Sequence, residues 1–208
     1  AERVGEPGTA MPDNKDEQSD DEAPWKKGRA GTAVGRAVHA VLQTIDLATG
    51  EGLDAAARAQ AAAEGVEDRL RDVVSFAEAA RQSAAVQAAV ASGRFWREVY
   101  VSALIDGTVV EGFIDLLYEA REGLVVVDYK TDSVVGEAID SAVERYRLQG
   151  AAYALALQQS LARPVASCTF VFVQPRDERP IAELPAAIDE VRALLRAASA
   201  PNRSADVP

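Results

Sequence analysis

Cysteine is nearly absent from this chain of 208 residues, which contains only Cys168. A single cysteine excludes a disulfide framework, a cysteine-rich zinc site and an iron–sulfur cluster held by four cysteines of this chain. Long apolar runs are also missing, because none approaches the roughly 20 residues that a membrane-spanning helix needs. The first five residues lack the apolar segment of a signal peptide, so we expect a cytoplasmic protein without a membrane segment.

Positive charge is scarce, with 22 Lys and Arg against 33 Asp and Glu and a net charge of −11. This balance excludes a uniformly basic nucleic-acid binder but permits an enzyme with a local basic groove. Residues 1–24 have few large apolar side chains and carry an acidic run from 13 to 22. We expect residues 1–30 to form a disordered acidic linker or tail, 31–199 to form one domain, and 200–208 to form a loose C-terminal tail.

Apolar residues at helical spacing predict several helices. Thr32 is a suitable N-cap for the first, which we expect to end before Gly50. The alanine-rich segment 54–92 reads as two or three helices, and Gly65 and Gly93 separate them from their neighbours. The remaining predicted helices cover residues 137–162 and 184–198.

Strands are predicted at residues 95–105, 108–119, 124–130 and 165–173. Asp106-Gly107 between the first two is a strong hairpin signal. The step from 124–130 through a long helix to 165–173 is a crossover, so these two strands should be parallel. We therefore expect an α/β fold of order αβββαβ, with a mixed sheet of about four to five strands flanked by helices.

The sharpest chemical feature is Asp128 and Lys130, which are two apart on a strand and therefore share one face. Asp115 interrupts an apolar run on the neighbouring strand. Two carboxylates at adjacent strand positions repel each other unless a cation lies between them, and carboxylate oxygens suit Mg²⁺. This pattern favours a metal site, although an Asp–Lys ion pair on a solvated sheet edge would also explain the first two residues.

Four further side chains are candidates for the same site. His39 is the only histidine, and imidazole is a good ligand for Mn²⁺, but a lone histidine on a helix also fits ordinary packing. Glu98 on the first strand could simply face solvent. Gln149 and Tyr153 lie four apart on one helical face, where packing with an amide cap is the alternative.

These residues and the segments around them, in their order along the chain, resemble the RecB-family branch of the PD-(D/E)xK nucleases. These form the exonuclease domain of bacterial helicase–nucleases of the RecB and AddA type. The resemblance implies a restriction-endonuclease-like core. The matching segments are Gly-Arg-Ala-Val-His at 35–39, Glu98, Glu-Gly-Phe-Ile-Asp at 111–115, Val-Val-Asp-Tyr-Lys-Thr-Asp at 126–132 and Gln-Gly-Ala-Ala-Tyr at 149–153.

The resemblance also implies roles for individual residues. His39, Asp115, Asp128 and the backbone carbonyl of Tyr129 would hold Mg²⁺ or Mn²⁺. Lys130 would orient the attacking water and stabilise charge on the phosphate, Gln149 and Tyr153 would position the DNA strand or this lysine, and Glu98 would be an auxiliary acid. Gly150 departs from the family pattern, which often has an apolar residue there.

The function implied is that of a metal-dependent DNA exonuclease or endonuclease domain, which hydrolyses phosphodiester bonds. Its partners would be single-stranded DNA or DNA ends and a helicase motor, on the same chain or on a partner, in double-strand-break repair and recombination. The chain has no phosphate-binding G-x-x-x-x-G-K-[ST] motif, so it is not itself the motor. The alternatives are a catalytically inactive nuclease-fold module that binds DNA ends or a helicase, and a stand-alone exonuclease.

Overall fold

The computed structural model describes residues 32–199, so the predicted tails at 1–30 and 200–208 lie outside the described residues. No helix in this range is long and apolar enough to cross a membrane. The helices are α1 (Ala33–Thr44), α2 (Leu53–Ala63), the short 3₁₀ turn η1 (Glu67–Arg69), α3 (Leu70–Arg81), α4 (Ala84–Ser92), α5 (Glu137–Leu161) and α6 (Leu184–Ser199). The strands are β1 (Phe95–Ile105), β2 (Thr108–Ala120), β3 (Gly123–Lys130), β4 (Val165–Phe172) and β5 (Asp177–Pro180).

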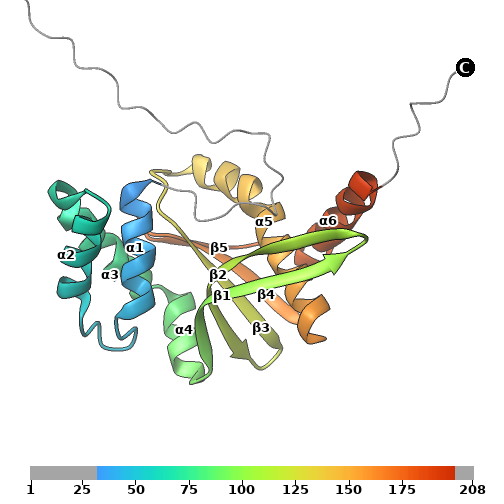
Figure 1. Ribbon diagram of the computed structural model, residues 1–208, viewed down its shortest axis with the longest axis horizontal. Coiled ribbons are helices and arrows are strands. Elements are labelled where there is room, and N and C mark those ends of the chain that lie inside the picture. The colour runs from blue at the N-terminus through green and yellow to red at the C-terminus, as the bar shows by residue number, and fades with distance from the viewer. Residues whose placement is uncertain (1–31, 200–208) are drawn as a thin grey trace, which may run out of the picture.

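The five strands form one mixed sheet in the order β1-β2-β3-β4-β5 (Figure 1). Strands β1, β2 and β3 are antiparallel neighbours, whereas β3 and β4 are parallel and joined through α5, as the crossover predicts. Strand β5 was not predicted. It is a short edge strand of Asp-Glu-Arg-Pro with no apolar alternation, so its sequence carries no strand signal.

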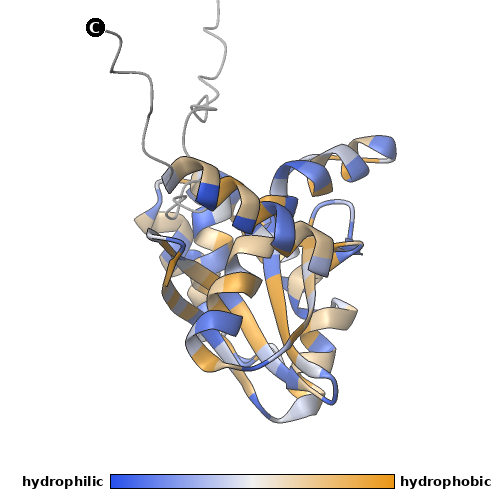
Figure 2. Cartoon of the chain, turned by 90° about the vertical axis from the view of Figure 1, so that its right-hand side faces the viewer, coloured by the Kyte–Doolittle hydropathy of each residue, from blue (hydrophilic) through white to orange (hydrophobic). Residues whose placement is uncertain are grey.

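Helices cover both faces of the sheet and create two hydrophobic cores. On one face α1–α4 pack against the sheet through residues such as Leu42 and Val127. On the other face α5 and α6 pack against it through residues such as Leu155 and Phe170. Figure 2 shows the apolar strands lying between the helices. Strand β3 is buried on both sides, which explains why it reads as a continuous apolar run.

The hairpin turn between β1 and β2 fixes their alignment. Asp106 and Gly107 have φ angles of 48° and 83°, the pattern of a two-residue type I′ turn. From this turn the pairing runs without a shift from Ile105 opposite Thr108 to Phe95 opposite Tyr118. The turn therefore determines which residue of β1 lies opposite each residue of β2.

Gly150 lies where α5 packs tightly against β4 and the residue after β5. A Cβ atom there would lie 2.6 Å from Cys168 Sγ and 2.8 Å from Ile181 Cδ1. This close approach is the physical reason for the departure from the family pattern after Gln149.

We expect Gly150→Ala to destabilise the protein by about 1–2 kcal/mol, because overpacking costs more than the roughly 1 kcal/mol that alanine gains in a helix. Urea unfolding would measure this, with exposed Ser141→Ala on the same helix as the control. Combining Gly150→Ala with Cys168→Ala should cost less than the sum of the two single changes. Equal or greater stability of the single Gly150 variant would contradict the packing explanation.

Candidate active site

The candidate site lies where β2 and β3 separate. Their pairing ends at Leu116 opposite Val127, so Asp115 and Asp128 are the next opposed positions. Instead of a backbone ladder bond, the Tyr129 N–H donates a hydrogen bond of 2.7 Å to Asp115 Oδ2. The side chain of Asp115 thus bridges the fork, and two carboxylates come to the same rung of the sheet.

Glu98 brings a third carboxylate to this rung. It lies between the pairs Arg97–Leu116 and Val99–Ile114, and is therefore opposite Asp115, although the two backbones do not pair there. Its φ angle is 51°, in the left-handed region that a non-glycine residue rarely adopts within a strand. Backbone strain of this kind clusters at functional sites.

The strain at Glu98 coincides with a reversal of the faces of β1. Phe95 packs against the core of α1–α4, whereas Val101, six residues later, packs against the core of α5 and α6. In a regular strand these two residues would share a face. The ribbon of β1 and β2 therefore turns over at the rung that carries the acidic residues.

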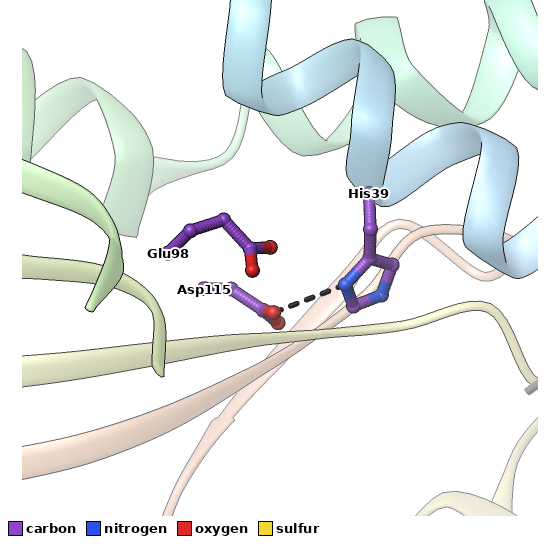
Figure 3. A group of neighbouring side chains, drawn as sticks. All are labelled: His39, Glu98 and Asp115. Atoms are coloured by element: carbon purple, nitrogen blue, oxygen red, sulfur yellow. Dashed lines mark hydrogen bonds and ion pairs between the residues drawn. The ribbon is translucent and has the colours of Figure 1, made fainter. Parts of the chain in front are cut away.

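His39 approaches the fork from α1 (Figure 3). Its Nδ1 atom lies 3.0 Å from Asp115 Oδ1, and its Nε2 atom lies 3.1 Å from the backbone oxygen of Tyr129. Potential ligand atoms of His39, Glu98 and Asp115 all lie within 4.8 Å of one another. The structure thus brings together three predicted site side chains and the predicted carbonyl.

Gly35 allows this approach. A Cβ atom on Gly35 would lie 2.8 Å from Thr131 Oγ1, so the first turn of α1 packs directly against the residue that follows β3. Thr32 caps the same turn by accepting a hydrogen bond from the Gly35 N–H. Because His39 is four residues after Gly35, it lies on the same helical face and faces the end of β3.

Both nitrogens of His39 face hydrogen-bond acceptors, which favours the protonated ring. Burial alone would lower the pKa of His39, but the negative charge of Asp115 and the hydrogen bond to it raise this pKa to about 9. Burial pushes the pKa of Asp115 upward, yet His39 and the Tyr129 N–H hold it below its ordinary value. An imidazolium–carboxylate pair therefore occupies the fork when no metal is bound.

The other half of the predicted site lies on the α5 side of the sheet. Lys130 Nζ is 2.6 Å from Asp128 Oδ2 and donates a hydrogen bond of 3.1 Å to Gln149 Oε1. The Gln149 amide in turn donates to the Tyr153 hydroxyl at 3.1 Å. Tyr153 lies across Gly112, where a Cβ atom would come within 2.5 Å of its ring, so a glycine is required at that position of β2.

The Asp128–Lys130 pair is deeply buried, with side chains 8% and 11% exposed. Burial raises the pKa of Asp128 above its usual range, although the charge of Lys130 opposes this. Burial would lower the pKa of Lys130, but Asp128 outweighs it and raises the pKa. Among the described residues, Oδ2 of Asp128 has no close partner other than the Lys130 ammonium.

These donors fit a hard divalent cation. The site offers a histidine nitrogen, carboxylate oxygens and a backbone oxygen, and Mg²⁺ and Mn²⁺ accept such ligands. Asp128 lies outside the group of His39, Glu98 and Asp115 and contacts Lys130, so its role as a ligand stays a prediction.

Two neighbours of Lys130 were not identified from the sequence. Tyr146 on α5 lies with its ring 3.8 Å from Lys130 Nζ, and its hydroxyl donates to Asp132. The sequence contains one signal for Tyr146, which precedes Gln149 by three residues and therefore lies on the same helical face. Asp132 lies two residues beyond Lys130, within the matching segment 126–132, but the resemblance implied no role for it.

The strain at Glu98 leads to a stability prediction. Alanine normally stabilises a strand interior relative to glycine by about 0.5–1 kcal/mol. At position 98 we expect the reverse, with Glu98→Gly more stable than Glu98→Ala by about 1 kcal/mol, because glycine adopts positive φ freely. Urea unfolding of both variants would test this against the same pair at exposed Ser102, where alanine should be the more stable. A more stable alanine variant at both positions would refute the strained geometry.

The protonation of His39 leads to a pH prediction for the metal-free protein. A pKa raised from 6.5 to about 9 contributes stability that is fully present below pH 6.5 and is lost as pH rises through 9. In a chelator, the melting temperature of the wild type relative to His39→Asn should therefore fall between about pH 6.5 and pH 10. A constant difference over this range would show that the ring is neutral in the folded protein.

Comparison with known proteins identifies the family. The model of the family described as "PD-(D/E)XK nuclease superfamily" matches residues 18–206 of this chain. An ATP-dependent helicase/nuclease subunit from Desulforudis audaxviator is 33% identical over 165 residues, which are 67% of this chain and 13% of that protein. A relative of the same name from Bacillus cereus (strain ATCC 10987 / NRS 248) is 36% identical over 75 residues, which are 32% of this chain and 6% of that protein.

A crystal structure from Eubacterium rectale, described provisionally as that of an exonuclease, has a TM-score of 0.42 at 16% identity. It covers 73% of this chain and 63% of that one, a similarity too low to support a functional argument. The chain spans 13% or less of the curated relatives named above. The match over residues 18–206 and the observed mixed sheet agree with the sequence motifs. The chain therefore belongs to the PD-(D/E)XK nuclease superfamily, as a nuclease domain of the RecB type.

Proposed function

We propose that this chain is a metal-dependent deoxyribonuclease domain that hydrolyses phosphodiester bonds at the fork between β2 and β3. The observation that carries the proposal is the convergence of His39, Glu98 and Asp115 within 4.8 Å, beside the buried Asp128–Lys130 pair. Structural ion pairs alone would not require three carboxylate-bearing strand positions on one rung. Like charges at such a rung repel each other, so a bound cation would stabilise them further, beyond the pairing of Asp115 with His39 and of Asp128 with Lys130.

His39, Asp115, Asp128 and the Tyr129 carbonyl would hold the cation, with Glu98 as an auxiliary acid. A bound divalent ion supplies a more acidic water and neutralises charge on the phosphate. Mg²⁺ suits the oxygen ligands, and Mn²⁺ also accepts the imidazole nitrogen. His39 must release its second proton to act as a ligand, so metal binding should weaken below the pKa of about 9.

The remaining side chains act on the substrate and the water. Lys130 orients the attacking water and stabilises negative charge on the phosphoryl oxygens, as an ammonium aimed at developing charge can do. Gln149 accepts a hydrogen bond from Lys130 and donates one to Tyr153, so this pair holds the lysine in position.

We also propose that the domain works within a larger helicase–nuclease in double-strand-break repair and recombination. Its relatives are named as ATP-dependent helicase/nuclease subunits, and the chain spans only a small part of them. Phosphate contacts dominate DNA affinity, and a net charge of −11 predicts weak intrinsic binding. A domain that binds DNA weakly by itself suits delivery of the strand by a motor.

The first test is cleavage of end-labelled single-stranded DNA with Mg²⁺ or Mn²⁺. We expect Asp115→Ala and Asp128→Ala to abolish cleavage and weaken metal binding. Lys130→Ala should keep metal binding and lower turnover by about 10²–10³-fold, since it removes a group that stabilises the transition state. Glu122→Gln, which changes an exposed acid in the turn between β2 and β3, is the matched control and should cleave like the wild type.

Wild-type cleavage by Asp128→Ala would refute this site. If the wild type binds metal but cleaves no substrate, the chain is an inactive module that binds DNA ends or a helicase partner.

A further inference from the structure

Tyr146 and Asp132 lie directly beside the lysine of the proposed site, and the proposed function gives neither of them a role. The Tyr146 hydroxyl donates to the carboxylate of Asp132, with distances of 2.9 and 3.1 Å to its two oxygens. This bond joins the middle of α5 to the loop that follows β3. The ring of Tyr146 is therefore fixed relative to the end of the strand that carries Lys130.

The ammonium of Lys130 lies over this ring. The distance from Nζ to the ring centroid is 3.8 Å, well inside the roughly 6 Å within which a cation is attracted to an aromatic face. The Phe170 ring is further away, at 5.6 Å. Three groups thus surround the ammonium, namely the Asp128 carboxylate, the Gln149 amide oxygen and the Tyr146 ring.

We infer that Tyr146, anchored by Asp132, is a positioning residue that holds Lys130 in place for catalysis. This inference rests on the proposed function. If the Asp128 carboxylate were to hold the metal, the ammonium would lose its strongest partner and would keep Gln149 and the ring. An ion pair alone would let the flexible lysine side chain follow the carboxylate, whereas the ring holds it from another direction.

The hydrogen bond to Asp132 suits this role in two ways. It fixes the plane of the ring, and a phenol that donates to an anion has a more electron-rich face for the cation. Burial, aided by Asp132 and opposed by Lys130, raises the pKa of Tyr146 to about 12, so the hydroxyl keeps its proton at neutral pH. Arg145 also lies near the ring, with its Cζ atom 5.9 Å from the centroid, but the Lys130 ammonium is much closer at 3.8 Å.

The kinetic test compares Tyr146→Leu, which removes the ring, with Tyr146→Phe, which keeps it. In single-stranded DNA cleavage we expect the leucine variant to lose about tenfold in kcat, with little change in KM or in the Mn²⁺ concentration for half-maximal rate. The phenylalanine variant should stay within about threefold of the wild type. Tyr118→Leu on β2 makes the same chemical change outside the site and should keep the wild-type kcat.

A second measurement does not depend on activity. Lys130 is the only lysine within residues 32–199, and the chain has three others, all in residues 1–31. With lysine-selective ¹³C labelling, Lys130→Ala identifies the resonances of Lys130 in the metal-free protein. The ring should shift its ε-methylene protons upfield in the wild type and in Tyr146→Phe, and this shift should vanish in Tyr146→Leu.

The outcomes separate the two hypotheses. Absence of cleavage by the wild type in every metal would overturn the proposed function and this inference with it. If the wild type cleaves, then undiminished kcat in Tyr146→Leu overturns the inference alone. An equal loss of kcat in Tyr118→Leu, or a loss confined to KM, would also overturn it. The expected kcat loss together with the lost ring-current shift supports it, even if the leucine variant is less stable.

Discussion

The separation of β2 from β3 after the Leu116–Val127 pair is the constraint on which the site depends. Parting two strands within a sheet leaves backbone donors and acceptors without partners, and buried groups of this kind are costly. Here the Asp115 carboxylate takes the Tyr129 N–H, while His39 approaches the Tyr129 carbonyl. The fork is thus stable because site side chains satisfy the backbone, which couples folding to the chemistry.

Charge is balanced across the fork in two buried pairs. His39 neutralises Asp115 on the α1 side, and Lys130 neutralises Asp128 on the α5 side. Removing one partner of a buried pair leaves an uncompensated charge, so each cation protects the fold as well as serving the site. In the proposed mechanism a divalent ion would add positive charge between these pairs. Metal binding would then change the protonation of His39 and the position of Lys130.

The sequence predicted most of the fold because its signals were local. The Thr32 cap, the Asp106-Gly107 turn and the crossover from β3 to β4 each follow from residue type and spacing, and the structure has all three. Strand β5 was missed because a short polar edge strand is specified by its neighbour and not by its own pattern.

The order of the motifs assigned His39 and Asp115 to one site. In the structure the two side chains meet although they are 76 residues apart. The backbone of Glu98 was not predictable, because its positive φ depends on how the whole ribbon turns over. The pairing of Tyr146 with Asp132 was also missed, since it depends on the rotation of α5 relative to the end of β3. Both features are tertiary, and residue spacing on one element does not specify them.

The two-residue turn at the end of the ribbon has a consequence for how the site can change in evolution. Each residue of β1 keeps its partner on β2 only while the connection holds two residues. One inserted residue there would shift the opposed position by one and place Arg97 or Val99, in place of Glu98, across from Asp115. The tip of the hairpin is exposed, yet its length constrains the site because it determines which residue of β1 lies opposite Asp115.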